Sequence, residues 1–245
     1  MKINNKEINK RITNLKTELA HLESLVKQNN RAPKKIPDSI DELADRIHND
    51  TLEDDLVVGD YIDFDLYTGE TVRAIVIGVQ HDELKNGELA DYTFGILCID
   101  MRFKMNDEHT NKTGWTDCKY RETYIPRIMK LLPAALQEHI LPVKKLTSAG
   151  NCSKKIVASV DKLFCFSEVE IFGETEYSCE GEGKQYPYFS EKEHREIPNY
   201  PWLRSPSYVS SSHFCYVGSS GEAYCNGAGY TRGVALGFCL SSSNR

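Results

Sequence analysis

The chain has 245 residues, 40% of them hydrophobic and 27% charged, and a formal net charge of −6 at pH 7. This length allows one large domain with an appendage, or two small domains, and the composition is ordinary for a soluble protein. No apolar run approaches the roughly 18 residues of a membrane-spanning helix, and the N-terminus lacks the apolar stretch of a secretory signal peptide. We therefore expect synthesis in a cytoplasm and no insertion into a membrane.

Residues 1–30 are predicted to form a coiled-coil helix. Apolar side chains recur there at spacings of 4, 3, 4, 3 and 4, the a/d seam of nearly three heptads. The seam consists of Ile8, Ile12, Leu15, Leu19, Leu22 and Val26. Because polar side chains flank the seam completely, we expect it to mediate self-association, with a homotrimer as the favoured form. The alternative is an amphipathic helix packed on its own domain.

Residues 31–55 are predicted to be a linker followed by a short acidic helix over residues 38–50, with Asp38 or Ser39 as its cap. The chain is cationic up to this point and acidic immediately after it. A cationic N-terminal arm can bind nucleic acid. Here the cations are spread around a helix with no aromatic residues between them, so no nucleic-acid partner is expected.

Residues 56–245 are predicted to form an α+β domain. Alternating apolar residues predict short strands, and the pattern over residues 120–138 predicts a helix that Pro133 interrupts. Asp60, Asp63 and Asp65 could belong to a calcium loop, but they alternate with apolar residues and lack the Gly and the terminal Glu of an EF-hand. We interpret them as the solvated face of a strand.

The eight cysteines and seven histidines give no metal-binding spacing, so neither a metal site nor a cofactor is expected. Cys98 and Cys165 lie in apolar runs and are predicted to be small buried hydrophobic residues. Ser167, Glu168 and His194 are residue types that can act in catalysis, but here they are explained equally well as surface or structural polar residues. No catalytic residue is therefore assigned.

Residues 207–232 differ from the rest of the chain in composition. They are rich in Tyr, Ser and Gly, the mixture that antibody-type binding loops use. Lys, Glu, Gln, Met and Trp, which an Asn codon randomised at its adenines cannot give, make up 50 of the 245 residues but occur here only as Glu222. A Ser/Gly-rich loop selected for its turns is the alternative.

Several short motifs resemble one protein family. They include Trp202-Leu203-Arg204-Ser205-Pro206 and the run from Gly233 to Cys239, with upstream matches such as Thr113-Gly114-Trp115. These motifs resemble the variable proteins of diversity-generating retroelements, which have a C-type-lectin fold of the formylglycine-generating-enzyme type. The resemblance covers roughly residues 56–240.

The resemblance implies a rigid lectin-like scaffold that displays residues 207–232 as a variable segment. Fifteen positions are expected to be exposed and to bind the ligand: Tyr208, Ser210, Ser211, His213, Tyr216, Gly218, Ser219, Ser220, Glu222, Tyr224, Asn226, Gly227, Gly229, Tyr230 and Arg232. The scaffold is expected to include Trp115, Trp202, Phe214, Val234 and Phe238, together with Val217, Gly221, Ala223, Ala228, Thr231 and Gly233. A position that accepts many residue types cannot be packed to interior density.

The resemblance further implies a receptor-binding protein of a phage tail tip or fibre, whose partners are a bacterial cell-surface protein or glycan, other tail proteins and copies of itself. A variable ligand-binding protein of a bacterial cell, at its surface or in its cytoplasm, is the alternative. A third possibility is a non-diversified structural domain of the same family. Formylglycine-generating enzymes use cysteines for oxidation, but Cys215 and Cys225 lie inside the segment expected to vary. We therefore expect a binding protein and not an enzyme.

Overall fold

The computed structural model describes residues 31–242. The chain divides into two compact units, Met1–Pro33 and Lys34–Arg245. The predicted seam, Ile8, Ile12, Leu15, Leu19, Leu22 and Val26, lies outside the described residues and stays a prediction. The second unit begins at Lys34 rather than near residue 56, because Ile36 and the short acidic helix contribute to its hydrophobic core.

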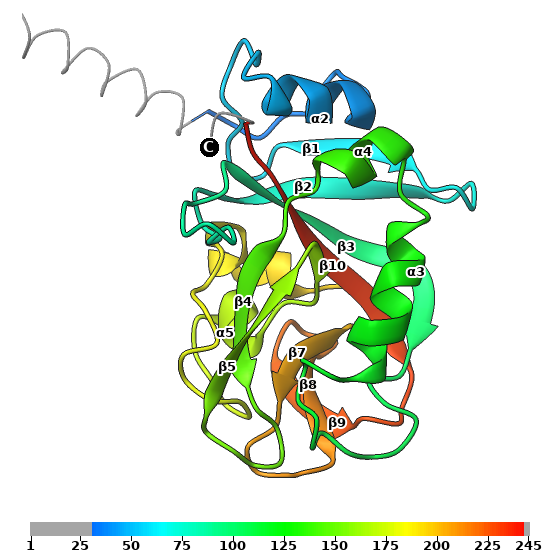
Figure 1. Ribbon diagram of the computed structural model, residues 1–245, viewed down its shortest axis with the longest axis vertical. Helices are drawn as coiled ribbons and strands as arrows, with labels where there is room; N and C mark the ends of the chain where they lie inside the picture. The colour runs from blue at the N-terminus through cyan, green and yellow to red at the C-terminus, as the bar shows by residue number, and fades with distance from the viewer. Residues whose placement is uncertain (1–30, 243–245) are drawn as a thin grey trace, which may run out of the picture. The chain divides into compact units, whose positions relative to one another are not determined.

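Five strands form the main sheet of the described part of the chain, in the order β1-β2-β3-β10-β6. They are β1 (Tyr61–Asp65), β2 (Thr71–Val79), β3 (Tyr92–Phe103), β10 (Arg232–Leu240) and β6 (Leu163–Phe164). Every neighbouring pair is antiparallel. The last strand in the sequence thus lies inside the sheet, beside β3 (Figure 1), and its residues Gly237 and Phe238 pair with β6 on the other edge.

Two smaller antiparallel sheets complete the strands of residues 31–242. One pairs β4 (Val143–Ser148) with β5 (Ile156–Asp161), and the other has the order β7-β8-β9, with β7 (Trp202–Pro206), β8 (His213–Val217) and β9 (Ala223–Gly227). The β7-β8-β9 sheet lies at the end of this unit away from α2 (Figure 1). These sheets and the helices confirm the predicted α+β class.

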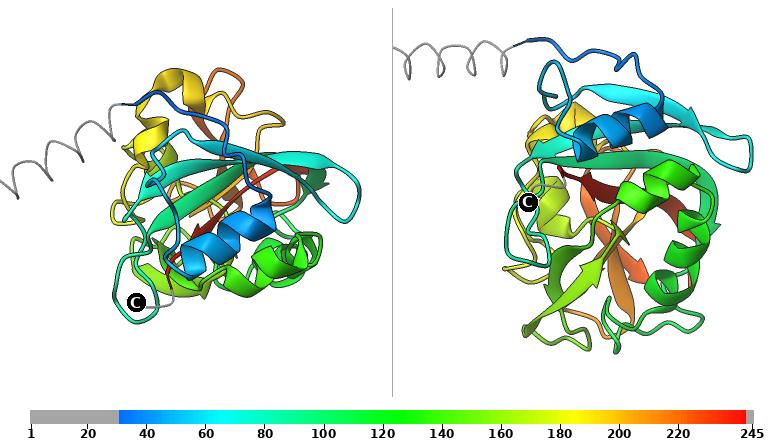
Figure 2. Two further views of the ribbon diagram at one scale, coloured as in Figure 1. Left: turned by 90° about the horizontal axis from the view of Figure 1, so that it is seen from above. Right: turned by 45° about the horizontal axis from the view of Figure 1, so that its top comes forward.

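The first described helix, α2 (Ile40–His48), covers one end of the unit, over β1 and β2 (Figure 2). Ser39 caps it, and the side chain of Glu42 closes a capping box by accepting the N–H of Ser39. Its buried face consists of Ile40, Leu43, Ala44 and Ile47. The Nε2 atom of His139 lies 2.7 Å from a carboxylate oxygen of Asp45, which links α2 to α4.

The predicted helix over residues 120–138 is confirmed in position but is divided into three pieces. They are a π-helical turn (Tyr120–Tyr124), α3 (Ile125–Met129) and α4 (Ala134–His139). The helix α3 ends at Met129, and Pro133, which has no N–H to donate to the preceding turn, is the N-cap of α4. The remaining helices are α5 (Glu168–Phe172) and two 3₁₀ turns (Pro187–Ser190 and Lys192–Arg195).

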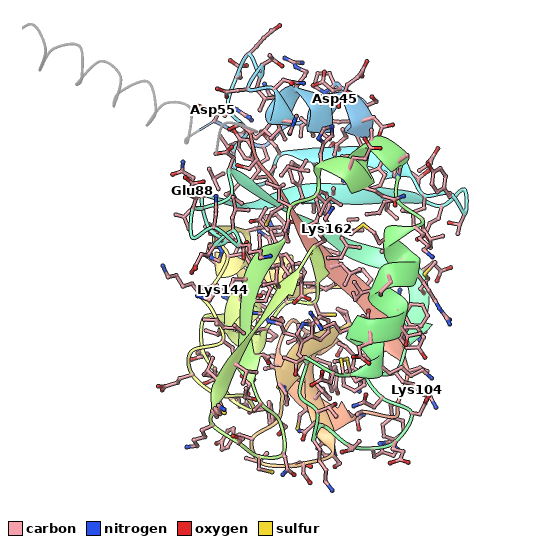
Figure 3. The ribbon with its side chains drawn as sticks, in the orientation of Figure 1. Asp45, Asp55, Glu88, Lys104, Lys144 and Lys162 are labelled. Atoms are coloured by element: carbon pink, nitrogen blue, oxygen red, sulfur yellow. The ribbon has the colours of Figure 1, made fainter. Side chains whose placement is uncertain are left out.

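The aromatic residues that were predicted to form the core are buried. Trp115, Trp202 and Phe238 are each at most 1% exposed, and Val234 and Phe214 are equally enclosed. Charged side chains such as those of Glu88 and Lys144 point away from the ribbon at the rim (Figure 3). No helix among the described residues is long and apolar enough to cross a membrane.

Two predictions about single residues are wrong. Asp60 is fully buried, because its carboxylate accepts the N–H groups of Lys34 and Val57 and so holds the entry to β1 in place. Cys98 is exposed although it lies in an apolar run, because its side chain is on the outer face of β3. Cys165 is buried as predicted.

Candidate functional site

The β8-β9 hairpin contains most of the segment expected to bind a ligand. Its strands pair in register from His213 opposite Gly227 to Val217 opposite Ala223. Side chains alternate between the two faces of the hairpin, so Phe214 and Tyr216 lie on one face while His213, Cys215 and Val217 lie on the other. The buried members of each face, Phe214 on the first and Cys215 and Val217 on the second, belong to the two hydrophobic cores.

An aromatic cluster lies on the face of Tyr216. The rings of Tyr216 and Tyr224, which are directly opposite each other, stack with centroids 5.8 Å apart. The indole of Trp202 contacts the ring of Tyr216 edge-on at 6.0 Å. The guanidinium of Arg232 lies 3.2 Å from the centroid of the Tyr216 ring, a cation–π contact that fixes both side chains. The buried Trp202 therefore orients the half-buried Tyr216, which in turn supports the exposed Tyr224.

A second exposed aromatic, Tyr230, has its own support. The imidazole of His109 contacts its ring edge-on, with centroids 4.8 Å apart. Next to His109 in the sequence, the buried Asn111 holds the loop before β8. Its side-chain amide lies 2.7–3.2 Å from the carbonyl oxygens of Ser207, Ser210 and His213. One amide thus fixes the backbone of a loop that exposes Tyr208, Val209 and Ser211.

A polar pocket of about 430 Å³ lies beside Tyr208. The side chains of Lys154, Thr175, Ser178, Cys179, Glu180 and Tyr208 line it. The ammonium of Lys154 is 5.5 Å from the centroid of the Tyr208 ring. The hydroxyl of Ser178 is buried without a hydrogen-bond partner.

The buried carboxylate of Glu168 holds the loop that forms one wall of this pocket. It accepts the backbone N–H groups of Glu176, Tyr177 and Ser178 at 2.7–3.2 Å. Three donors offset the cost of burying the charge. The backbone of Tyr208 is tied to the same loop by its N–H, which donates to the carbonyl of Tyr177 at 2.9 Å. The pocket wall is therefore preformed.

Beneath the hairpin, a buried ionic network fixes β7. The guanidinium of Arg204 on β7 binds the carboxylate of Glu170 on α5, and Lys145 on β4 binds both Glu170 at 2.7 Å and Asp82 at 2.6 Å. All four side chains are at most 5% exposed. Although burial opposes it, Arg204 and Lys145 lower the pKa of Glu170, which stays ionised. This network joins three elements that support the site.

A second buried carboxylate in this region, that of Glu182, has a raised pKa, in contrast to Glu170. Ser205 donates its hydroxyl to Glu182, and the backbone N–H of Ser148 donates at 2.7 Å. Burial dominates over these hydrogen bonds and raises the pKa of Glu182 to about 7. At neutral pH this carboxyl group is therefore partly protonated.

The structure divides the predicted ligand-binding positions into three groups. Seven are exposed, namely Tyr208, Ser211, Ser219, Ser220, Glu222, Tyr224 and Tyr230, of which the tyrosines are 36%, 44% and 55% exposed. Six are partly buried, namely Ser210, His213, Tyr216, Asn226, Gly229 and Arg232. The remaining two, Gly218 and Gly227, are buried and correct the prediction.

Close packing explains the two glycines. A Cβ atom at Gly227 would lie 2.2 Å from Nδ1 of His109, and one at Gly218 would lie 2.5 Å from the ring of Tyr224. A side chain at Gly227 would displace His109, which supports Tyr230, and a side chain at Gly218 would displace Tyr224 itself. These positions therefore hold the site and do not present side chains to a ligand.

The scaffold positions within the segment, and Gly233 directly after it, match the prediction with two exceptions. Phe214, Val217, Gly221, Ala228 and Gly233 are buried. Thr231 is exposed and Ala223 is partly buried. Thr231 lies between the end of the hairpin and β10, and its side chain is not covered by another element of the described chain.

Sequence reasoning missed the upstream residues of the site. His109, Asn111, Lys154, Tyr177 and Ser178 come from loops far from residues 207–232, and no periodicity marks them. The acidic loop with Glu174, Glu176, Glu180 and Glu182 was the available signal. Of these four glutamates only Glu182 is buried, and nothing in the sequence distinguishes it from the other three.

No metal site is found among the described residues. The Sγ atom of Cys225 lies 3.7 Å from Nδ1 of His213. Burial raises the pKa of both Cys215 and Cys225, so only a small fraction of either thiol is ionised at neutral pH. The surface groups of the site are hydroxyls and aromatic rings together with the charged side chains of Lys154, Glu180 and Glu222, which suit contact with a polar ligand.

Comparison with known protein families gives one match. A family described as a domain of unknown function, DUF6273, matches residues 89–242. The chain belongs to the DUF6273 family. The match runs from just before β3 to the end of β10 and so includes every element of the site. Neither a curated protein nor a solved structure matches the chain.

Proposed function

We propose that this protein is a ligand-binding protein and that the β8-β9 hairpin and its neighbouring loops contact the ligand. The observation that carries the proposal is that exposed tyrosine rings lie on a backbone held by buried side chains. Tyr208, Tyr224 and Tyr230 face solvent, whereas the backbone beneath them is fixed by Glu168, Asn111 and other buried groups. Rigid aromatic side chains lose little entropy on binding and dominate the energy of interfaces.

We also propose that this domain is a C-type-lectin-like scaffold whose C-terminal segment is diversified by a retroelement. In support, β10 lies within the main sheet, directly after the segment, so both ends of the segment are anchored by core strands. Thirteen of the fifteen positions expected to vary are exposed or partly exposed. The genomic test is a reverse-transcriptase gene near a copy of the 3′ end that differs only at adenines.

The partner in this proposal is a receptor on a bacterial cell, either a protein or a glycan. The protein would act as a homotrimer at a phage tail tip or fibre, as the predicted coiled coil and the family resemblance suggest. The pocket beside Tyr208 would receive a polar group of the receptor, because it offers three hydroxyls, an ammonium and a carboxylate. A ligand-binding protein of a bacterial cell would use the same surface.

The test is a triple variant, Tyr208→Ala, Tyr224→Ala and Tyr230→Ala, assayed for retention on intact cells of a panel of bacterial strains. We expect binding to fall at least tenfold while the free energy of unfolding changes by no more than about 1 kcal/mol, because exposed side chains contribute little to stability. Tyr67→Ala is the matched control, because Tyr67 is 65% exposed on the β1–β2 turn, outside the site.

Two outcomes would count against the proposal. If the triple variant and Tyr67→Ala bound cells equally well, the exposed rings would not be the contact surface. If the triple variant lost several kcal/mol of stability, the rings would be structural, and the segment would be an ordinary loop.

A further inference from the structure

Two cysteines lie directly opposite each other in the β8-β9 hairpin. Cys215 on β8 pairs in register with Cys225 on β9. Directly opposite residues of an antiparallel pair have side chains on the same face of the sheet. Both sulfur atoms therefore project to the side that contains Val217 and Ala223, away from the aromatic cluster.

The hydrogen bonds of the hairpin identify what kind of pair the cysteines form. The N–H of Gly218 donates to the carbonyl of Glu222 at 2.8 Å, which makes these two residues a hydrogen-bonded pair. Pair types alternate along an antiparallel ladder, so Tyr216 and Tyr224 are again hydrogen-bonded, and Cys215 and Cys225 are not.

The hydrogen bonds that β8 makes on its other side, toward β7, agree with this alternation. The N–H of Val217 donates to Pro201, and the carbonyl of His213 accepts from Ser207, so both groups point away from β9. Val217 and His213 are each two positions from Cys215, and all three residues are therefore in non-hydrogen-bonded pairs with β9. In such a pair the Cα atoms are about 4.5 Å apart, within the range of roughly 4.4–6.8 Å that a disulfide requires.

The two thiols differ in access. Cys215 is fully buried, whereas Cys225 is partly exposed and lies 3.7 Å from His213. A reagent in solution can reach Cys225 first, and Cys215 is then the nearest thiol to the modified sulfur. This is the order expected when an accessible thiol forms the mixed disulfide and a buried thiol resolves it.

We propose that Cys215 and Cys225 form a reversible cross-strand disulfide by exchange with a small-molecule disulfide, for example oxidised glutathione. The Cys225 thiolate attacks one sulfur of oxidised glutathione, which releases one glutathione thiolate and leaves a mixed disulfide. The Cys215 thiolate then attacks the Cys225 sulfur and releases the second glutathione. The two cysteine protons end on the two glutathione thiolates, so the cysteines are oxidised and the reagent is reduced.

This inference is independent of the proposed binding function, because it rests only on the register and on access. Its consequence is a covalent link behind the stacked Tyr216 and Tyr224. The link restrains the strands that carry these rings. Oxidation would then stabilise the hairpin without altering the exposed surface.

The experiment uses the full reduced chain incubated with oxidised glutathione and then digested with trypsin. The sequence has no Lys or Arg between Arg204 and Arg232, so one peptide of residues 205–232 contains both cysteines. We expect this peptide to be two hydrogen atoms lighter than its reduced form. After a second cleavage at Glu222, its halves should stay joined until a reductant is added. The oxidised protein should also melt several degrees higher.

Three results would overturn the proposal. They are free thiols in this peptide, a glutathione that stays on Cys225, and a bond from either cysteine to a third one. The variants Cys225→Ser and Cys215→Ala supply the control. Neither should gain thermal stability with oxidised glutathione, and an equal gain in Cys225→Ser would assign the effect to another cysteine. Cys98 and Cys152, which are exposed, serve as internal markers that the reagent was active.

Discussion

At the scale of single residues, the site depends on polar groups that the core has enclosed. Glu168, Glu182 and Asn111 are all fully buried, yet each holds a backbone segment that ends at the surface. A buried polar group is tolerated only when it is hydrogen-bonded. The hydrogen bonds that satisfy these buried polar groups also fix the loops, so the buried groups make the surface loops rigid.

The pH dependence of stability should report on Glu182. Its pKa is raised from 4.5 to about 7 in the folded protein, mainly by burial. The folded state therefore binds more protons than the unfolded state between these values, and the free energy of unfolding falls as the pH rises. The loss is at most about 3 kcal/mol, at 1.36 kcal/mol per pKa unit.

Urea unfolding at pH 5, 6, 7 and 8 checks this prediction. Stability should decline up to about pH 7 and then level off, and Glu182→Gln should remove the decline. Glu180→Gln is the matched control, since Glu180 is exposed on the same loop. A Glu182→Gln profile that coincided with the wild-type profile would contradict the assignment. Below pH 4 a separate loss is expected, because Glu170 has a lowered pKa and must be protonated there.

At the scale of elements, the loop over residues 173–182 owes its form to one carboxylate. Glu168→Gln removes the charge and replaces an acceptor oxygen with an N–H donor that faces the N–H groups of Tyr177 and Ser178. We expect a loss of about 2–3 kcal/mol, the cost of leaving buried donors without a charged acceptor. Amide hydrogen exchange at residues 176–178 should rise at the same time.

The control for this loop is Glu174→Gln, an exposed glutamate in the same segment. It makes the same change in charge and should alter neither stability nor exchange. If Glu168→Gln lost stability but kept slow exchange at residues 176–178, its role would be confined to α5, and the loop would be held by other contacts.

At the scale of the whole molecule, the sequence predicted the α+β class and the aromatic core because both leave local signals. Trp202 and Phe238 lie in apolar runs, and the cap at Ser39 follows from its spacing to Glu42. The upstream residues of the site were not predictable. Asn111 binds the carbonyl oxygen of Ser207, 96 positions away, and Glu168 binds backbone N–H groups, which have no sequence signature. Gly218 and Gly227 were misassigned because close approach is a property of the tertiary structure.

Self-association is the last prediction and concerns the seam of residues 8–26. Charged side chains at Leu15 and Leu22 would place carboxylates inside a coiled-coil interface, where burying them without partners is unfavourable. The double variant Leu15→Glu and Leu22→Glu should therefore sediment as a monomer, whereas the wild-type chain should sediment as an oligomer, with a trimer expected. Lys16→Glu is the control, because position 16 lies outside the seam.

The thermal midpoint of the unit from Lys34 onward should not change, since its core is made by its own residues. A wild-type chain that is monomeric at micromolar concentration would contradict the coiled coil, and the seam would then belong to a helix that packs within a single chain.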